Sequence, residues 1–253
     1  MSNFRIWPLR TGTIVLDKGE YITRGIDHGL QVSVPATAWY LTDGRYKVLV
    51  DTGMCETALA DWHHPGSFQG EDEPIHERLK ALGVRPEEIE LIILTHLHWD
   101  HCHNLGQFPN ARRVVTKREL MFALDPIPLY FKSYEHERLG KRAPFVGVKF
   151  DTVEGETELL PGIQVFPTLG HSVGHQSVAV QTAKGAHVIT GDACFAYVNL
   201  EPASEILPFT IMGRVVDLED AWHSLEAIAE RADVVLPGHD EAVFKQPAYP
   251  EED

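Results

Sequence analysis

Apolar and polar residues alternate along the first fifty residues of the chain, for example at 13–16. This spacing of two is typical of half-buried β-strands, and the pair Asp43-Gly44 predicts a tight hairpin before the apolar run 46–50. Apolar residues then recur at helical spacing over 75–82, and a mostly β-branched run, 92–94, follows. The first part of the chain is therefore expected to form antiparallel strands, then a helix and a buried strand.

The same kind of pattern continues through the second part of the chain. Strands are expected around 113–115, 163–166, 177–180, 187–190 and 234–236, with a short helix near 118–121. A later amphipathic helix is expected to pack through Leu218, Trp222, Leu225 and Ala229. Residues 125–145 carry prolines and aromatic side chains without a regular period, which predicts an irregular insertion that could serve as a lid or substrate wall. Strands and helices in two roughly equal halves predict an α/β architecture of two sheets sandwiched between helices.

The composition favours one domain over residues 1–253. With 43% hydrophobic residues, the chain can bury one substantial core and has little room for a second. No opening stretch pairs a basic flank with a long apolar run, and no window approaches a membrane span, so we expect a soluble, cytoplasmic protein. Three cysteines, Cys55, Cys102 and Cys194, are too few for a disulfide framework and are expected to be small buried hydrophobes.

The net charge of the chain restricts the classes of molecule that it is expected to bind. A formal net charge of −15 opposes binding to a phosphate backbone, since nucleic-acid binders need a basic footprint. Nucleases and other nucleic-acid proteins are therefore disfavoured, and a small-molecule substrate is expected. The sequence leaves a homodimer open.

Histidine and aspartate residues gather directly after the strand predicted at 92–94. Alternating residues of an extended segment point the same way, so His96 and His98 can hold one ion together. Asp100 and His101 then face a second position. Imidazole nitrogen and carboxylate oxygen are the ligands that borderline cations such as Zn²⁺ prefer. The segment therefore predicts a metal site on a loop at the end of a strand.

Three further candidate ligands stand at predicted strand ends: His171, Asp192 and His239, each directly after a glycine. Glycine permits the sharp turn that lets a strand end present a side chain to a shared cleft. Asp51, after the strand at 46–50, has two interpretations: it orients a ligand histidine, or it forms a turn.

The order His96-x-His98-x-Asp100-His101, His171, Asp192, His239 resembles the metallo-β-lactamase superfamily over nearly the whole chain. The resemblance implies a four-layer αββα sandwich, two mixed sheets flanked by helices. It implies two divalent metal ions, Zn²⁺ in the first place and Fe, Mn or Co as alternatives. The first would be held by His96, His98 and His171, the second by Asp100, His101 and His239, with Asp192 as a bridge. Metallo-β-lactamases proper lack this bridging aspartate, which argues against antibiotic hydrolysis.

Within the superfamily the chain is most similar to the N-acyl homoserine lactone lactonases, which quench quorum sensing, through the segments 51–54, 170–177 and 238–240. This likeness implies hydrolysis of a lactone by a metal-bridging hydroxide, in which Asp100 protonates the departing alkoxide. Two departures are Cys102-His103-Asn104, where the family commonly has glycines, and Phe195, where it commonly has a tyrosine that binds the substrate carbonyl. Tyr197 is the candidate to replace that phenol. The expected substrate contacts are Met54, Tyr130, Phe131, Phe195 and Tyr197.

Other histidines are expected to have no catalytic role. His103 and His175 are interpreted as structural, and the pair His63-His64 as loop surface. Alternative functions are a glyoxalase II-type thioester or ester hydrolase, an iron-dependent persulfide dioxygenase of the same fold, and a non-catalytic binding protein. Metal content and product analysis separate these alternatives.

Overall fold

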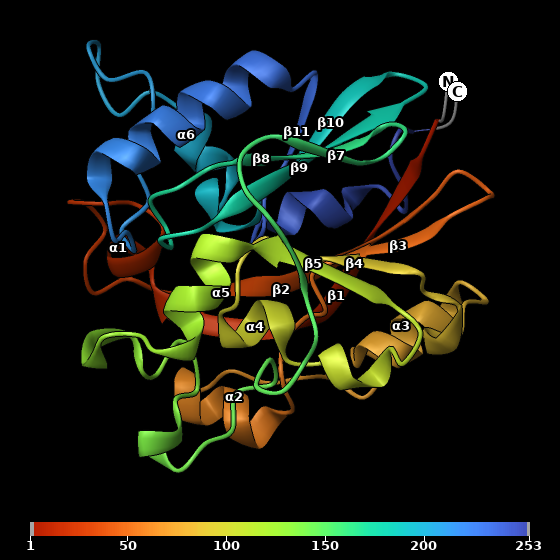
Figure 1. Ribbon diagram of the computed structural model, residues 1–253. Helices are drawn as coiled ribbons and strands as arrows, with labels where there is room; N and C mark the ends of the chain where they lie inside the picture. Colours follow the sequence, from red (N-terminus) through yellow and green to blue (C-terminus); the bar gives the residue numbers. More distant parts are fainter. Residues whose placement is uncertain (1–2, 252–253) are drawn as a thin grey trace.

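Two mixed β-sheets form the centre of the protein (Figure 1). The structure is a computed structural model and describes residues 3–251. The first sheet has the order β1 (Arg5–Asp17), β2 (Gln31–Thr42), β3 (Lys47–Val50), β4 (Leu91–Ile93), β5 (Arg112–Thr116) and β6 (Asp151–Val153). The second has the order β11 (Val234–Leu236), β10 (Gly185–Ile189), β9 (Gln176–Thr182), β8 (Ile163–Pro167) and β7 (Thr157–Leu160). Strands β3 to β6 pair in parallel, as do β10 and β11, and the other pairs are antiparallel.

Helices cover the outer faces of both sheets (Figure 1). The α-helices are α1 (Lys18–Tyr21), α2 (Thr57–His63), α3 (Ile75–Ala81), α4 (Trp99–Cys102), α5 (Lys117–Leu124) and α6 (Leu218–Arg231). The short 3₁₀ helices are η1 (Pro86–Glu88), η2 (Leu105–Gln107), η3 (Pro128–Tyr130), η4 (Glu137–Leu139), η5 (Gly191–Ala193), η6 (Tyr197–Leu200) and η7 (Glu241–Lys245). In the described part of the chain no helix is long and apolar enough to cross a membrane.

Alternation along single strands explains the layers. In β3, Val48 and Val50 face the second sheet, while Leu49 between them faces the cluster that includes helix α3. In β10, Ile189 belongs to the core between the sheets, whereas Val188 packs against α6. Each sheet therefore buries both faces, one against the other sheet and one against helices. This arrangement confirms the predicted four-layer αββα sandwich.

The prediction of which residues form the apolar face of helix α6 is wrong in part. Ala221, Leu225 and Ile228 are buried, whereas Leu218 is 45% exposed and Ala229 is exposed as well. The buried residues are spaced by four and three, one helical stripe that begins one turn after the Asp217 cap. Leu218 is the first helical residue and is exposed at the N-terminal end of α6, before the buried stretch begins.

The topology brings several strand ends to one edge of the sandwich. The histidine segment follows β4, His171 lies in the connection between β8 and β9, Asp192 follows β10, and His239 follows β11. The irregular segment 125–145 lies near this edge and anchors itself in the core through Tyr134 and Phe145. The fold therefore positions residues far apart in sequence around one site.

Candidate metal centre

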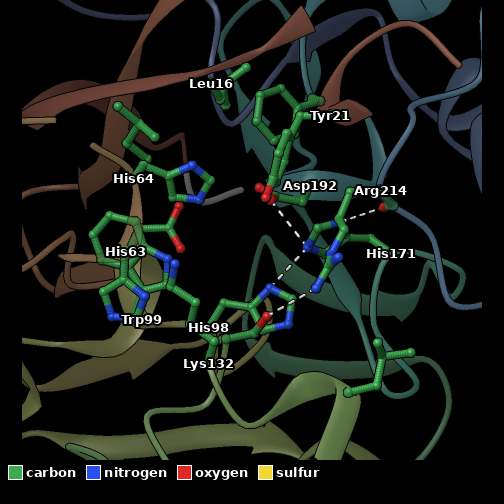
Figure 2. A pocket seen from close by; sticks show the side chains of 15 residues that line it. Leu16, Tyr21, His63, His64, His98, Trp99, Lys132, His171, Asp192 and Arg214 are labelled. Atoms are coloured by element: carbon green, nitrogen blue, oxygen red, sulfur yellow. Dashed lines mark hydrogen bonds and ion pairs between the residues drawn. The ribbon is translucent and has the colours of Figure 1, made fainter. Parts of the chain in front are cut away.

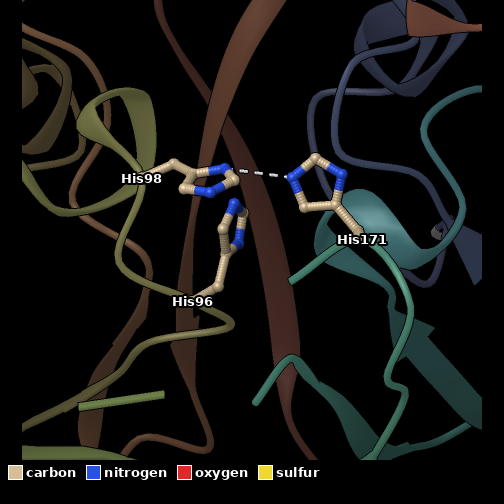
Figure 3. A group of neighbouring side chains, drawn as sticks. All are labelled: His96, His98 and His171. Atoms are coloured by element: carbon tan, nitrogen blue, oxygen red, sulfur yellow. Dashed lines mark hydrogen bonds between the residues drawn. The ribbon is translucent and has the colours of Figure 1, made fainter. Parts of the chain in front are cut away.

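The structure brings all seven predicted ligands together. Three sets of ligand atoms lie within 4.8 Å of one another, and every residue in them is buried. Figure 3 shows the first set, in which His96 and His98 from the loop after β4 face His171 from the second sheet. The sets are His96, His98 and His171; His96, His101 and Asp192; and Asp100, His101 and His239.

Asp192 lies between the sets. Its Oδ1 is 3.1 Å from Nε2 of His101 and 3.0 Å from Nε2 of His239. Its Oδ2 is 3.2 Å from Nε2 of His171. Asp100 approaches from the other side, with Oδ2 3.6 Å from Nε2 of both His101 and His239. One carboxylate thus faces histidines of two different sets, as a bridging ligand must.

Several buried atoms at the centre have no hydrogen-bond partner. They are Nε2 of His96, His101 and His239 and Oδ1 of Asp192. Buried polar atoms are nearly always paired, so a group of neighbouring nitrogen and oxygen atoms without hydrogen-bond partners favours a site for a positive ion. Imidazole and carboxylate donors suit divalent metals. The residues therefore fit the metal ions that the resemblance implies.

The other ring nitrogen of most ligand histidines is held by an oxygen. Nδ1 of His239 donates to the carbonyl of Pro35 at 2.8 Å, and Nδ1 of His171 donates to the carbonyl of Arg214 at 3.0 Å. Nδ1 of His96 is 3.1 Å from the hydroxyl of Thr95. These contacts fix the ring orientation and leave Nε2 with its lone pair toward the centre.

Asp51 combines the two roles that the sequence left open. Its Oδ2 accepts a hydrogen bond from Nδ1 of His101 at 2.8 Å, and its carboxylate also accepts from the amide and hydroxyl of Thr95, each at 2.8 Å. Its φ of 59° lies in the left-handed region, which aspartate tolerates in turns. Asp51 therefore makes a tight turn and orients a candidate ligand at once.

Burial and charge set the protonation of the centre. Burial lowers the pKa of His96 and of His98 well below 6.5, so both rings are neutral and can donate a lone pair. Burial also opposes charge on His101, but the carboxylates of Asp192, Asp100 and Asp51 outweigh it and raise the pKa of that ring well above 6.5. Metal binding to His101 must therefore displace a proton.

Glu119 joins the loops that carry the ligands. This fully buried side chain of α5 accepts hydrogen bonds from the amide of Leu97 (3.1 Å) and the hydroxyl of Tyr134 (2.9 Å) on Oε1. On Oε2 it accepts from the hydroxyl of Ser172 (2.7 Å) and the amide of Gly174 (3.1 Å). Leu97 stands between His96 and His98, and Ser172 follows His171, so one carboxylate connects two ligand loops with the 125–145 segment.

A pocket of about 250 Å³ opens onto the centre (Figure 2). Asp100 and Asp192 line it together with His98 and His171. The other residues around it are the apolar side chains Ile14, Leu16, Leu129 and Phe195, the aromatic side chains Tyr21 and Trp99, and the polar side chains His63, His64, Lys132, Ser133 and Arg214. A small molecule in this pocket therefore reaches the candidate metal ligands directly.

Phe195 is the one expected substrate contact that lines the pocket. Its ring stacks on His239, with centroids 4.2 Å apart and planes at 26°. Tyr197 lies outside the pocket, contrary to expectation, because its hydroxyl donates to the carbonyl of Val235 at 3.0 Å and its ring packs in the core between the sheets. Tyr197 therefore does not supply the phenol missing at Phe195.

The other three expected contacts also point elsewhere. Met54 is fully buried, in the core cluster near β1. Phe131 stacks on His136, and Tyr130 lies under the guanidinium of Arg214. The 125–145 segment lines the pocket instead through Leu129, Lys132 and Ser133. Because this segment has no regular period, the sequence did not indicate which of its residues face inward.

His63 and His64 line the pocket, so their interpretation as loop surface is wrong. His63 ends helix α2, is buried, and stacks on Trp99 with centroids 4.2 Å apart and planes at 6°. Its Nε2 lies 3.0 Å from Oε1 of Glu135, a buried residue of the 125–145 segment. Three segments distant in sequence make this packing, so a local pattern could not reveal it.

His175 has the structural role expected of it. Its Nε2 accepts a hydrogen bond from the amide of Asp192 at 3.1 Å, and Nδ1 lies 3.0 Å from the hydroxyl of Thr168. Burial lowers its pKa to about 3, which keeps the ring neutral and Nε2 free to accept. His175 thus fixes the backbone that presents Asp192. His103 lies outside the pocket lining, with Nδ1 3.7 Å from Glu135.

Comparisons with known proteins agree with this geometry. The family model of the metallo-beta-lactamase superfamily matches residues 33–239, a range that contains every candidate ligand. An N-acyl homoserine lactonase from Bacillus cereus is 28% identical, with 95% of this chain and 94% of the relative covered. The N-acyl homoserine lactonase AttM from Azorhizobium caulinodans is 28% identical, with 98% and 99% covered.

Solved structures give the same result. An N-acyl homoserine lactone hydrolase with the product N-hexanoyl-L-homoserine at its catalytic metal centre has a TM-score of 0.79 and 26% identity, with 99% of each chain covered. Fold, ligand geometry and family model agree over the same residues. The chain therefore belongs to the metallo-beta-lactamase superfamily and is a metal-dependent hydrolase of that superfamily.

Proposed function

We propose that this enzyme holds two divalent metal ions and opens the ring of a lactone, an N-acyl homoserine lactone or a related compound. The observation that carries the proposal is Asp192, whose two oxygens face His171 on one side and His101 on the other. The lactonase names of its relatives support the substrate class. Zn²⁺ is the first candidate, since the donors are imidazole and carboxylate, and Fe, Mn or Co would also suit them.

The side chains divide into two sets around this bridge. His96, His98 and His171 would hold one ion, and Asp100, His101 and His239 the other. Two such cations, when bound, would lower the pKa of a bound water toward 7 and so supply hydroxide for attack on a lactone carbonyl at neutral pH. The protein's part is to hold the ligands rigidly, through Asp51 at His101 and the carbonyl of Pro35 at His239.

Asp100 is the residue proposed to move the proton. It belongs to the second set, and its carboxylate also lines the pocket, with 11% of the side chain exposed. A ring oxygen that leaves in the pocket would therefore lie beside Asp100, whose carboxylate would take the proton that the attacking water gives up and pass it to that oxygen. The apolar side chains Ile14, Leu16 and Leu129 form the wall against which an acyl chain or ring would pack.

Phe195→Tyr should raise kcat/KM for a lactone by about 10-fold, which is less than the roughly 10²-fold that a well-placed donor at the developing oxyanion gives. The new hydroxyl would extend from a ring that already lines the pocket beside His239. Tyr197→Phe is the matched control, because it removes only the bond to Val235 and should leave kcat/KM unchanged. Steady-state kinetics on both variants checks this, and a loss of activity in Tyr197→Phe alone would contradict the pocket assignment.

The proposed function is tested by pH-stat measurement of acid release from short and long N-acyl homoserine lactones, simple lactones, aryl esters and thioesters. Metal content is measured on the same sample. We expect two metal ions per chain and fastest turnover of a lactone, with loss of activity in chelator and recovery on adding Zn²⁺, Mn²⁺ or Co²⁺. Turnover confined to thioesters would favour a glyoxalase II-type activity. Inactivity on every lactone would overturn the proposal.

A further inference from the structure

Two cationic side chains in the metal pocket have no carboxylate partner. Arg214 and Lys132 both line the pocket, and within residues 3–251 neither forms an ion pair. Arg214 donates to the hydroxyl of Ser133 at 3.4 Å and lies over the ring of Tyr130. Lys132 lies over the ring of Trp62, with Nζ 5.4 Å from the centroid. Their partners are all neutral, so both keep their charge available to a ligand.

Other cations of this protein are neutralised by carboxylates of the chain itself. The chain has 37 acidic and 22 lysine and arginine side chains, and several of its basic side chains pair with carboxylates. Examples of such pairs are Arg10 with Glu241, Lys18 with Asp27, Lys47 with Glu88, Arg112 with Asp151 and Arg231 with Glu156. Arg214 and Lys132 differ from these pairs because they line the pocket of the candidate metal centre and form no ion pair there, which makes the pocket a candidate site for a negative charge from outside.

The two cations come from segments that are distant in sequence. Lys132 belongs to the 125–145 segment, and Arg214 precedes helix α6. Figure 2 shows Arg214 beside His171, whose Nδ1 donates to the Arg214 carbonyl. Both also act on His64, whose pKa falls to about 4, chiefly through burial and partly through these two charges. An anion bound by these cations would therefore lie in the same pocket as the candidate ligands His98 and His171 and the neutral ring of His64.

We propose that the substrate of this enzyme is a lactone that carries a carboxylate, which Arg214 and Lys132 bind; the inference rests on the proposed lactonase function. The planar guanidinium matches a carboxylate in a two-point hydrogen bond, and the lysine adds a point charge. The apolar side chains Leu16 and Leu129 would contact the carbon skeleton between the lactone ring and the carboxylate. Substrate recognition would then combine an apolar wall with one ionic contact.

The test uses the metal-loaded full-length enzyme and three matched γ-lactones. They are γ-butyrolactone, a γ-butyrolactone with a ring carboxylate, and the primary amide of that acid. We expect kcat/KM for the carboxylate to exceed that for the amide by about 10-fold or more, the effect of one charged hydrogen bond. The advantage should shrink between 50 and 500 mM NaCl, because salt screens the two cations.

Substitutions locate the effect. In Arg214→Gln the ratio of carboxylate to amide kcat/KM should fall to near one, and in Lys132→Met it should fall by a smaller factor. Lys141→Met is the matched control, because Lys141 lies over the same Trp62 ring, at 4.4 Å, but does not line the pocket. This control should keep the wild-type ratio. Thermal melts of all three variants identify any loss that comes from unfolding.

Two outcomes count against the inference in different ways. Equal hydrolysis of carboxylate and amide by the wild-type enzyme, with the same ratio in Arg214→Gln, would overturn the carboxylate site and leave the lactonase function standing. Failure to hydrolyse any of these lactones or any N-acyl homoserine lactone would overturn the lactonase function and this inference with it.

Discussion

Asp192→Asn should lose most of the bound metal and most of the lactone hydrolysis together. The carboxylate lies within 3.2 Å of Nε2 of His101, His171 and His239. Burial opposes its charge, yet these histidines hold the pKa of Asp192 well below 3.8, so it is the anion around which the centre is built. Asparagine keeps the shape and removes the charge. Substitution of a residue that only hydrogen-bonds to a metal ligand typically lowers metal affinity or activity by about 10- to 100-fold. Substitution of a bridging ligand should lower them by at least as much.

The measurement is metal content by elemental analysis, together with kcat/KM at saturating metal. Asp233→Asn is a suitable control, because Asp233 is an exposed aspartate that accepts from the amide of Ala186 at the edge of the second sheet. The control should bind metal and hydrolyse lactone as wild type does. An Asp192→Asn enzyme that retained two metal ions and full turnover would show that this carboxylate is not a bridge.

Glu119→Gln should destabilise the protein by about 3 kcal/mol and weaken metal binding by about 10-fold or more. Each carboxylate oxygen accepts one backbone amide, Leu97 on Oε1 and Gly174 on Oε2. A glutamine must therefore turn its NH₂ group toward one of these amides, whichever way its side chain is flipped. The result is two donors facing each other in a fully buried site, next to two ligand loops.

Chemical unfolding of the metal-free protein and a metal competition titration measure the two effects separately. Tyr134→Phe offers a graded comparison, since it removes one neutral donor and leaves the carboxylate with three. Glu154→Gln is the surface control, because its pair with Lys117 is exposed and should contribute little. If Glu119→Gln lost stability but bound metal with wild-type affinity, Glu119 would be a core residue without influence on the ligand loops.

The sequence predicted the parts of the site that depend on local patterns. Each candidate ligand after the histidine segment directly follows a glycine at a strand end, so strand periodicity placed His171, Asp192 and His239 at one edge before their distances were known. Asp51 also stands directly after a strand, β3, although valine and not glycine precedes it, and it lies near the candidate ligands. Its two roles could not be separated, because a turn and a hydrogen bond to His101 use the same residue.

The residues that sequence reasoning missed depend on packing between distant segments. In the sequence, Glu119 resembles any exposed charged residue near the start of a helix. Only the fold shows that its carboxylate is buried beside Ser172 and Tyr134. His63 follows Trp62 in a polar stretch, and only its stacking on Trp99 makes it a pocket residue. The sequence also did not show that Lys132 and Arg214 line the pocket. Neither the 125–145 segment nor the stretch before α6 has a regular spacing of apolar residues that distinguishes buried from exposed positions.

The order in which the ligands occur along the chain limits when the site can exist during synthesis. His239 follows β11, which lies at the edge of the second sheet and pairs in parallel with β10. While the ribosome is still making α6, His96 to Asp192 already exist, but the strand that presents His239 does not. The nascent chain can thus offer only part of the candidate ligand set, so binding of the two proposed metal ions by all seven candidate ligands must follow synthesis and docking of that last strand.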